Sequence, residues 1–325
     1  MNVQSVNFQG LFFVNVAKPT DFEIKFLKNT YDFNPLSLED YLTKTQIPKI
    51  ENHGKYDLMV LRFPIFSEDA PQTSHQYGIL SLPVVNSGPR KRRLTSSYVD
   101  LFISDEYVVV LHDGILPQID RIFNLCQKSL HNRAEYMSKG SAFLVYKIID
   151  ALVDDCFPSI NEITSTIDRI DKELEEKQTQ KTLEDISLTR RNLVVFHTMI
   201  KPTLPLFNEL VEGKHKELNG PMQPYWGNIL GHLEKIWDRV EDNRELIEGI
   251  SISNESLLSS RNNEIVKFLT VITSIVFPFA VVNNLYSMNV PLPDAKDPNI
   301  VWILFAIIFL AAIIIVSYFR RKKWL

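Results

Sequence analysis

The chain has 325 residues, with 39 acidic and 35 basic side chains and a net charge of −4 when histidine is neutral. Its length predicts about two domains. Residues 1–267 carry about −7, because residues 268–325 hold five basic and only two acidic side chains. This acidic balance excludes nucleic acid as an expected partner.

The two cysteines, Cys126 and Cys156, lie in helix-like segments without metal-ligand spacing. A disulfide framework needs more cysteines and an oxidising compartment, so we expect buried, reduced thiols. The first residues contain neither a charged leader nor a long apolar core, and no signal or transit peptide is predicted.

Residues 1–115 predict a mixed α/β domain, the start of an α+β cytoplasmic region. Four β-branched or aromatic runs of strand length are separated by segments rich in glycine and proline. These runs are residues 11–16, 56–63, 78–85 and 107–112. Short helices are expected at residues 21–28 and 38–42.

From residue 116 to residue 262 the apolar residues recur with the spacing of an α-helix. We expect the stretch from residue 142 to residue 176 to be helical, starting apolar and ending as a charged, solvated helix end near a hairpin tip. A return helix is expected over residues 183–210, bent or broken by Pro202 and Pro205. A connection rich in glycine and proline follows.

A long stalk helix is predicted to start near residue 225, because no proline occurs from there to Phe277. Apolar residues and two asparagines follow steps of three and four along it, as in a coiled coil. These positions are Ile229, Leu233, Ile236, Val240, Asn243, Ile247, Ile250, Asn254 and Leu257. An unbroken helix into the membrane would be about 90 Å long, and we expect its seam to pack several copies around an axis. The alternative is an ordinary packing helix that ends near Gly249.

Two segments near the C-terminus are long enough to cross a membrane. No charged side chain occurs between Lys267 and Asp294 or between Asp297 and Arg320, and a crossing helix needs about 20 apolar residues. We predict a first transmembrane helix at 263–287, an extracytoplasmic loop at 288–299 and a second transmembrane helix at 300–319. The basic tail, residues 320–325, is expected on the cytoplasmic side together with the N-terminal domain.

The end of the chain carries a set of motifs in a fixed order. Asn263-Glu264-Ile265-Val266-Lys267-Phe268-Leu269-Thr270 is followed by Pro278, then by Tyr286-Ser287-Met288-Asn289, and the chain ends with Lys322-Lys323-Trp324-Leu325. In order and spacing these residues resemble the CorA family of divalent-cation channels. Weaker similarity covers residues 144–160 and 225–250. One position departs from the family signature Gly-Met-Asn, since Ser287 stands where glycine belongs.

The resemblance implies a homo-oligomer, in the form of a pentameric funnel, in the lipid bilayer of a prokaryotic plasma (inner) membrane. The implied cargo is Mg²⁺, with Co²⁺ or Ni²⁺ as further cations, and no other cofactor is expected. Two alternatives stay open. One is a Zn²⁺ transporter of the same family with proton coupling, and the other is a nonconducting membrane-anchored sensor or scaffold.

The resemblance places the outer recognition site in the loop motif, at Asn289 with the turn residues Tyr286, Ser287 and Met288. Mg²⁺ gives up its waters reluctantly, so an amide and backbone carbonyls suit the hydrated ion through its water shell. Glycine allows a positive φ that serine tolerates poorly, at a cost on the order of 1 kcal/mol. We therefore expect the aperture at Ser287, and with it the ion preference, to differ from the family pattern.

The steps of three and four along the stalk can be continued into the first predicted transmembrane helix. They then select one face of that helix, with polar residues at both ends. It comprises Asn263, Val266, Leu269, Thr270, Thr273, Phe277, Ala280, Asn284 and, at the mouth, Ser287. In a symmetric oligomer such a face can line a water-filled path that is gated by dewetting at bulky apolar residues. The pattern alone fits one side of a lipid-facing or tightly packed helix equally well, and the resemblance favours the pore. Amides within a span are costly unless they face a polar cavity or another subunit, which favours Asn284 in the pore lining.

The resemblance also implies a cytoplasmic Mg²⁺ sensor built from carboxylates between neighbouring domains, one of them at the stalk position held here by Asn228. An amide is a much weaker Mg²⁺ ligand than a carboxylate, so we expect this site to be weakened or moved. Asp238, Glu241 and Asp242 are alternatives, unless they are ordinary surface acids.

Other functional classes lack their motifs in this chain. No phosphate-binding Gly-x-x-x-x-Gly-Lys-Ser/Thr occurs, and the apolar stretches at residues 268–286 and 300–319 contain no ionisable side chain of the kind that proton-coupled carriers usually place in the membrane. The seven histidines are scattered without metal-ligand spacing, and no enzymatic activity is predicted. Passive, gated conduction is the expected function.

Overall fold

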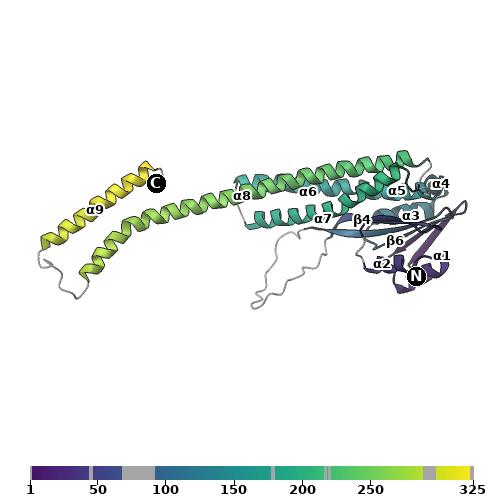
Figure 1. Ribbon diagram of the computed structural model, residues 1–325, viewed down its shortest axis with the longest axis horizontal. Coiled ribbons are helices and arrows are strands. Elements are labelled where there is room, and N and C mark those ends of the chain that lie inside the picture. The colour runs from purple at the N-terminus through teal and green to yellow at the C-terminus, as the bar shows by residue number, and fades with distance from the viewer. Residues whose placement is uncertain are drawn as a thin grey trace. The chain divides into compact units, whose positions relative to one another are not determined.

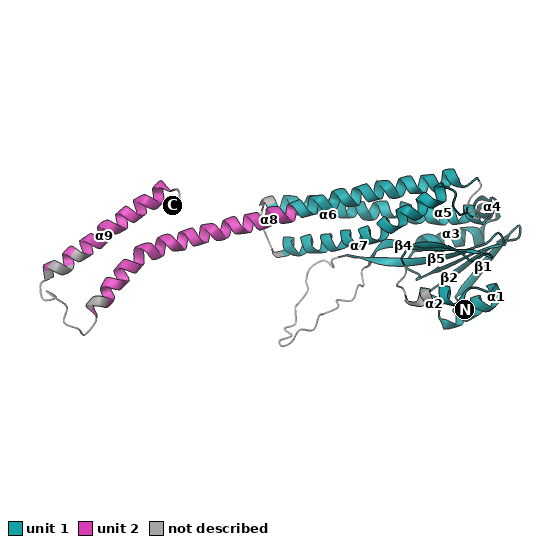
Figure 2. Ribbon diagram, viewed as in Figure 1, with its two compact units in different colours: residues 1–249 teal, residues 250–325 magenta. Residues whose placement is uncertain are grey.

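The computed structural model describes residues 2–43, 47–67, 92–176, 180–215, 218, 221–287 and 298–322 (Figure 1). The chain forms two compact units, residues 1–249 and residues 250–325 (Figure 2). The first unit contains a β-sheet and helices, and the second contains the end of one long helix and a further helix. The boundaries expected after residues 115 and 262 stay predictions.

A six-stranded sheet forms the centre of the first unit, in the order β1-β2-β6-β5-β4-β3. The strands are β1 (Val3–Phe8), β2 (Leu11–Ala17), β3 (Lys49–Asn52), β4 (Asp57–Ser67), β5 (Arg93–Ile103) and β6 (Tyr107–His112). Neighbouring strands are antiparallel except β2 and β6, which are parallel. The β1–β2 hairpin turns through Gln9 and Gly10, whose φ values of 51° and 92° suit a two-residue turn that follows the twist of the sheet.

Three of the predicted strands are confirmed, at residues 11–16, 56–63 and 107–112. The strand predicted at residues 78–85 lies outside the described residues. The sequence does not predict β1, β3 or β5. The first two lie at the sheet edges and bury few side chains, and β5 begins with a basic residue, so the local pattern is weak in all three. β5 nevertheless forms a strand because it pairs with β4 along its whole length.

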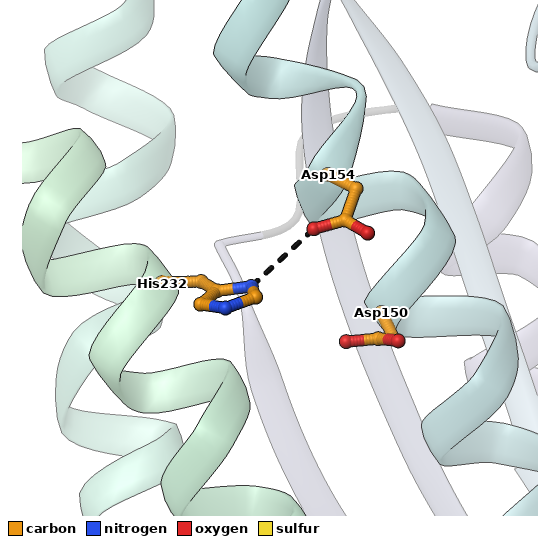
Figure 3. Close-up of side chains that lie close together, drawn as sticks. All are labelled: Asp150, Asp154 and His232. Atoms are coloured by element: carbon orange, nitrogen blue, oxygen red, sulfur yellow. Dashed lines mark ion pairs between the residues drawn. The ribbon is translucent and has the colours of Figure 1, made fainter.

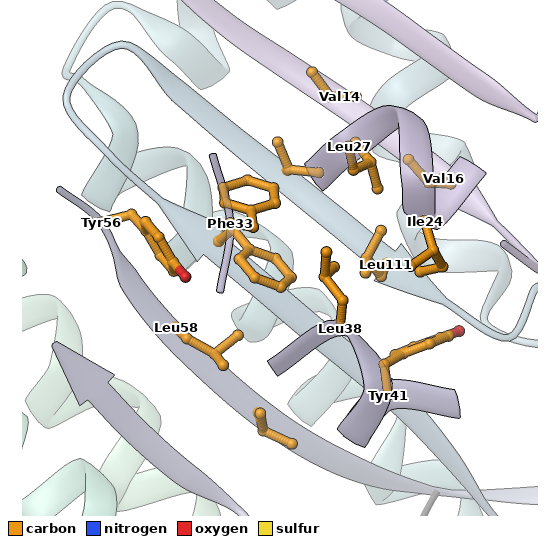
Figure 4. Close-up of a cluster of buried hydrophobic side chains, with 13 residues drawn as sticks. Val14, Val16, Ile24, Leu27, Phe33, Leu38, Tyr41, Tyr56, Leu58 and Leu111 are labelled. Carbon is orange, nitrogen blue, oxygen red and sulfur yellow. The ribbon is translucent and has the colours of Figure 1, made fainter. Parts of the chain in front are cut away.

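One face of the sheet is covered by α1 (Asp21–Tyr31) and α2 (Pro35–Thr43), which confirm the two predicted short helices. Leu27 and Phe33 belong there to one buried apolar cluster with Leu58 and Phe102 of the sheet (Figure 4). The rings of Phe33 and Phe102 are stacked with their centroids 4.2 Å apart. Each such fully buried apolar side chain stabilises the fold by about 1.5–3 kcal/mol relative to an exposed one.

Helices from the middle of the chain pack against the opposite face. They are α3 (Pro117–Lys128), α4 (Leu130–Met137), α5 (Ser141–Asp154), α6 (Cys156–Glu176) and α7 (Gln180–Val211). Successive residues of a strand face opposite sides, so Phe13 of β2 contacts Phe123 of α3 at 5.2 Å between ring centroids, while Val14 joins the cluster under α1. α7 is one helix through Pro202 and Pro205, so the return helix is not broken there, and the alternative of a bend stays a prediction.

Both cysteines are buried free thiols, as the sequence predicts. Cys126 in α3 is 0% exposed and Cys156 at the start of α6 is 1% exposed. Burial raises the pKa of Cys126 to about 11 and also raises the pKa of Cys156, because both thiolates would be poorly solvated.

α8 (Gln223–Tyr286) is a single helix of 64 residues, which confirms the continuous stalk and excludes an end near Gly249. Within the first unit its seam is at most 2% exposed: Ile229, Leu233, Ile236, Val240, Asn243 and Ile247. The seam packs on helices of the same chain (Figure 1). Asn243 Nδ2 donates to Thr164 Oγ1 of α6 at 2.9 Å, and Glu248 pairs with Arg190 of α7 at 2.8 Å. The expectation that this part of the seam packs several copies is therefore wrong, because an apolar period does not identify its partner.

Glu23 closes the N-terminus of α1. Its carboxylate accepts hydrogen bonds from the Thr20 hydroxyl and from the backbone N–H groups of Asn2 and Thr20, the last two at 3.1 Å. All three donors favour the charged carboxylate and lower the pKa of Glu23 to about 2. Glu23 thereby ties the residue before β1 to the start of α1.

Glu23→Gln is expected to lower the midpoint of thermal unfolding near neutral pH and to have little effect below about pH 2. The pKa of Glu23 is about 2 in the folded chain and about 4.3 in an unfolded one. The stabilisation is therefore complete above the unfolded value and disappears as the pH falls towards the folded value. Circular dichroism of the detergent-solubilised protein across this pH range measures the effect. Asp21→Asn, in the same helical turn, is the control, and an equal loss at every pH in both variants contradicts the assignment.

Candidate ion pathway and metal cluster

The second half of α8 carries the residues that are predicted to line a pore. Among the described residues, it is the one helical stretch long and apolar enough to cross a membrane. Thr270 is half-buried in the single chain, and the other predicted positions are exposed: Asn263, Val266, Leu269, Thr273, Phe277, Ala280 and Asn284. Residues on other sides of the helix are equally open, with Ile265 64% and Phe268 62% exposed. Exposure in one chain does not separate a pore face from a lipid face, and the pore lining stays a prediction.

α9 (Pro298–Arg321) is a 24-residue helix in the place of the predicted second transmembrane segment. It carries no charged side chain before Arg320, and its last turn is basic. The helix is therefore confirmed, while its crossing of a membrane stays a prediction.

Two threonine hydroxyls on the predicted pore face are already used as donors within α8. Thr270 Oγ1 donates to the backbone carbonyl of Val266 at 2.7 Å, and Thr273 Oγ1 donates to that of Leu269 at 2.9 Å. A hydroxyl has one donor and two acceptor lone pairs. Both threonines therefore keep acceptor capacity for water or for a hydrated cation.

Ser287 continues the geometry of α8 instead of forming a left-handed turn. Its backbone N–H donates to the Asn283 carbonyl at 3.1 Å and its Oγ donates to the same carbonyl at 2.8 Å. Ser287 is not one of the described residues with a positive φ. The strain expected from replacing glycine is therefore absent. The side chain of Tyr286, and both Met288 and Asn289, lie outside the part of the chain that the structure describes.

Asn228 lies beside a cluster of possible metal ligands at the junction of α5 and α8. Its Nδ2 donates to Asp150 Oδ1 at 3.4 Å. One turn further along each helix, His232 Nδ1 lies 3.3 Å from Asp154 Oδ1 (Figure 3). One ligand atom each from Asp150, Asp154 and His232 lies within 4.8 Å of the others. A single small cation can reach all three side chains.

The electrostatics of this cluster favour a bound cation. Burial and the negative charge of Asp154 raise the pKa of Asp150, and a cation between the two carboxylates would offset this repulsion. His232 Nδ1 is buried without a hydrogen-bond partner in the described part of the chain. Two carboxylates and an imidazole suit Co²⁺, Ni²⁺ or Zn²⁺, whereas Mg²⁺ prefers oxygen ligands alone.

The alternative acidic positions on α8 are less suited to a cation. Glu241 accepts a hydrogen bond from Arg244 at 3.0 Å and lies 3.4 Å from His197 Nε2. Its charge is therefore already balanced by neighbouring side chains. Asp238 and Asp242 belong to no cluster of three ligands among the described residues.

Sequence reasoning missed this cluster because its ligands come from two helices. Asp150 and Asp154 are four residues apart and share one face of α5, and this spacing is the signal that sequence reasoning could have used. His232 joins them only because the α8 seam packs against the other helices, which the spacing of the histidines along the chain does not reveal.

The family model described as CorA-like Mg²⁺ transporter protein matches residues 8–321. The chain belongs to the CorA family. The match includes the sheet, the long helix α8 and the helix α9. Its family makes the chain a CorA-type transporter of divalent metal ions and a membrane protein.

Individual CorA proteins are similar to this chain over most of their length. The cobalt/magnesium transport protein CorA of Thermotoga maritima is 28% identical over 296 residues, which are 91% of this chain and 78% of that protein. The protein of the same name from Methanocaldococcus jannaschii is 21% identical over 319 residues, 97% of this chain and 92% of that one. The complete structure of the CorA magnesium transporter from that organism has a TM-score of 0.75 at 20% identity and covers 98% of this chain and 94% of the other. This likeness confirms the fold of the mixed α/β part and the long helix.

Co²⁺ is expected to raise the midpoint of thermal unfolding of this CorA-family protein, and His232→Ala is expected to weaken Co²⁺ binding by about tenfold or more. The imidazole supplies one of the three side chains of the cluster. Thermal unfolding of the full-length protein in detergent, titrated with Co²⁺, measures the affinity.

His215→Ala is the matched control, because His215 lies near Glu209 and outside the cluster. The control is expected to bind Co²⁺ as the wild type does. Equal Co²⁺ affinity in the wild type and in His232→Ala would remove the cluster as a metal site.

Proposed function

We propose that the chain is a pentameric channel that conducts divalent cations, foremost Mg²⁺, across a prokaryotic plasma membrane. The observation that carries the proposal is the continuity of α8. This helix passes without a break from the folded first unit into an uncharged stretch of membrane length, and it ends at the motif that begins with Tyr286 and Ser287.

The outer mouth is formed in this proposal by Tyr286, Ser287, Met288 and Asn289. Mg²⁺ holds its waters tightly, so a ring of neutral amide and carbonyl acceptors selects the hydrated ion through its water shell. Ser287 does not have a positive φ, so its side chain causes no backbone strain. Its hydroxyl supports the idea that the mouth differs chemically from a Gly-Met-Asn mouth. Co²⁺ and Ni²⁺ are further candidate cargoes.

The path continues along the face from Asn284 to Asn263. The acceptor capacity of Thr270 and Thr273 supports a wetted segment. Leu269 and Phe277, which are 58% and 69% exposed in the single chain, are the bulky apolar residues at which the path closes by dewetting.

Cation sensing on the cytoplasmic side is assigned in this proposal to Asp150, Asp154 and His232, beside the weak ligand Asn228. The family's sensor position on the stalk is Asn228, and His232 lies one helical turn further along α8. The short distances within the cluster support a cation site at this shifted position.

Asn289→Ala is expected to abolish cation flux and to leave assembly intact, because it removes the amide that contacts the hydrated ion. Uptake of Mg²⁺, Co²⁺ and Zn²⁺ into liposomes that contain the purified protein, with and without a pH gradient, measures the flux. Asn299→Ala is the control and is expected to conduct.

Normal Mg²⁺ uptake by Asn289→Ala would remove the recognition role of this residue. Zn²⁺ flux that rises with the pH gradient would favour a proton-coupled zinc transporter. An intact wild-type oligomer without flux of any ion would favour a sensor or scaffold.

Ser287→Gly is expected to raise Mg²⁺ flux or to shift selectivity towards Mg²⁺. Ser287→Ala separates two causes, because alanine removes the hydroxyl bonded to the Asn283 carbonyl but keeps a side chain at this position. If the hydroxyl sets the ion preference, both variants change selectivity in the same direction. Unchanged ion preference in both variants would show that Ser287 is neutral.

A further inference from the structure

Two consecutive amides, Asn283 and Asn284, lie near the end of the uncharged stretch of α8, and both are exposed in the single chain. Successive residues of an α-helix are about 100° apart around its axis. The two side chains therefore face different surroundings, and a pore can account for only one of them.

Asn284 shares its stripe of α8 with residues that the proposed path uses, Phe277, Ala280 and Ser287, at steps of three and four. Asn283 belongs to another stripe, with Ile272, Val276 and Phe279 at the same steps. Ile272 is 41% and Val276 is 55% exposed, and Phe279 is half-buried. Asn283 is thus the one polar side chain on an otherwise apolar stripe between residues 272 and 283.

The Asn283 side chain lacks a hydrogen-bond partner among the described residues. Its backbone carbonyl accepts from Ser287, but no bond to its amide group occurs in this part of the chain. A side-chain amide within hydrocarbon is stable only when another protein group bonds to it. The candidate partners are therefore groups beyond the described residues, and a neighbouring copy of α8 is the one that the proposed oligomer supplies.

We propose that the Asn283 amide hydrogen bonds to α8 of a neighbouring copy, so that Asn283 holds the oligomer together while Asn284 faces the ion path. This inference rests on the proposed oligomeric pore. In a ring of parallel helices with Asn284 towards the axis, a residue about 100° away around the helix faces the adjacent helix. A single buried amide on an apolar helix interface fixes register and the number of copies.

The test compares Asn283→Leu with Asn284→Leu, which exchange chemically identical side chains one residue apart. The full-length variants are purified in detergent, the fraction of oligomer is measured by light scattering during heating, and Mg²⁺ uptake is measured in liposomes. Asn283→Leu is expected to increase dissociation by about tenfold and to leave flux per intact oligomer unchanged. Asn284→Leu is expected to leave the oligomer stable and to reduce flux. Asn283→Gln keeps the amide and is expected to restore most of the oligomer.

The outcomes separate this inference from the proposed function. A wild-type oligomer that conducts, together with an Asn283→Leu oligomer of equal stability, overturns the role of Asn283 alone and indicates a partner such as α9 of the same chain. The same holds if Asn284→Leu dissociates as readily as Asn283→Leu. A wild-type protein that is monomeric or does not conduct overturns the proposed function as well.

Discussion

The hydrogen bond between Asn243 and Thr164 lies in the middle of a buried helix seam and fixes the position of α8 along α6. Asn243 is 2% exposed, and a buried amide that loses its partner is costly, so sliding α8 by one turn is strongly disfavoured. The same helix then extends beyond its own domain with large apolar side chains exposed. One continuous helix therefore has a first half that is stabilised within the chain and a second half that requires surroundings outside it.

The parts of the fold that could be predicted are those with a strong local pattern. The apolar runs of β2 and β6 and the proline-free stretch of α8 from residue 225 to residue 277 are visible in the sequence, and each forms the expected element. The partner of the α8 seam could not be predicted, because buried residues such as Ile236 show the same period against the same chain or against a copy. The cluster of Asp150, Asp154 and His232 was missed for a related reason, since it exists only after two distant helices have packed.

Ser287 stands at the glycine position of the family motif and keeps a helical backbone. The helical hydrogen bonds of its N–H group mean that the glycine of the common motif is not required for backbone conformation at this position. The difference between the two residues is then one of size and of an added hydroxyl. In the proposed mouth, ion selectivity is then a question about which groups at Ser287 meet the water shell of the ion.

The two native cysteines have a practical consequence for labelling chemistry. Cys126 and Cys156 are buried and their pKa values are raised, so neither presents a reactive thiolate to a water-soluble reagent. A cysteine introduced on α8 is then the reactive thiol of the molecule without removal of the native ones. Charged and membrane-permeant maleimides would distinguish residues that contact water from residues that contact lipid, position by position along the helix, in the otherwise unmodified chain.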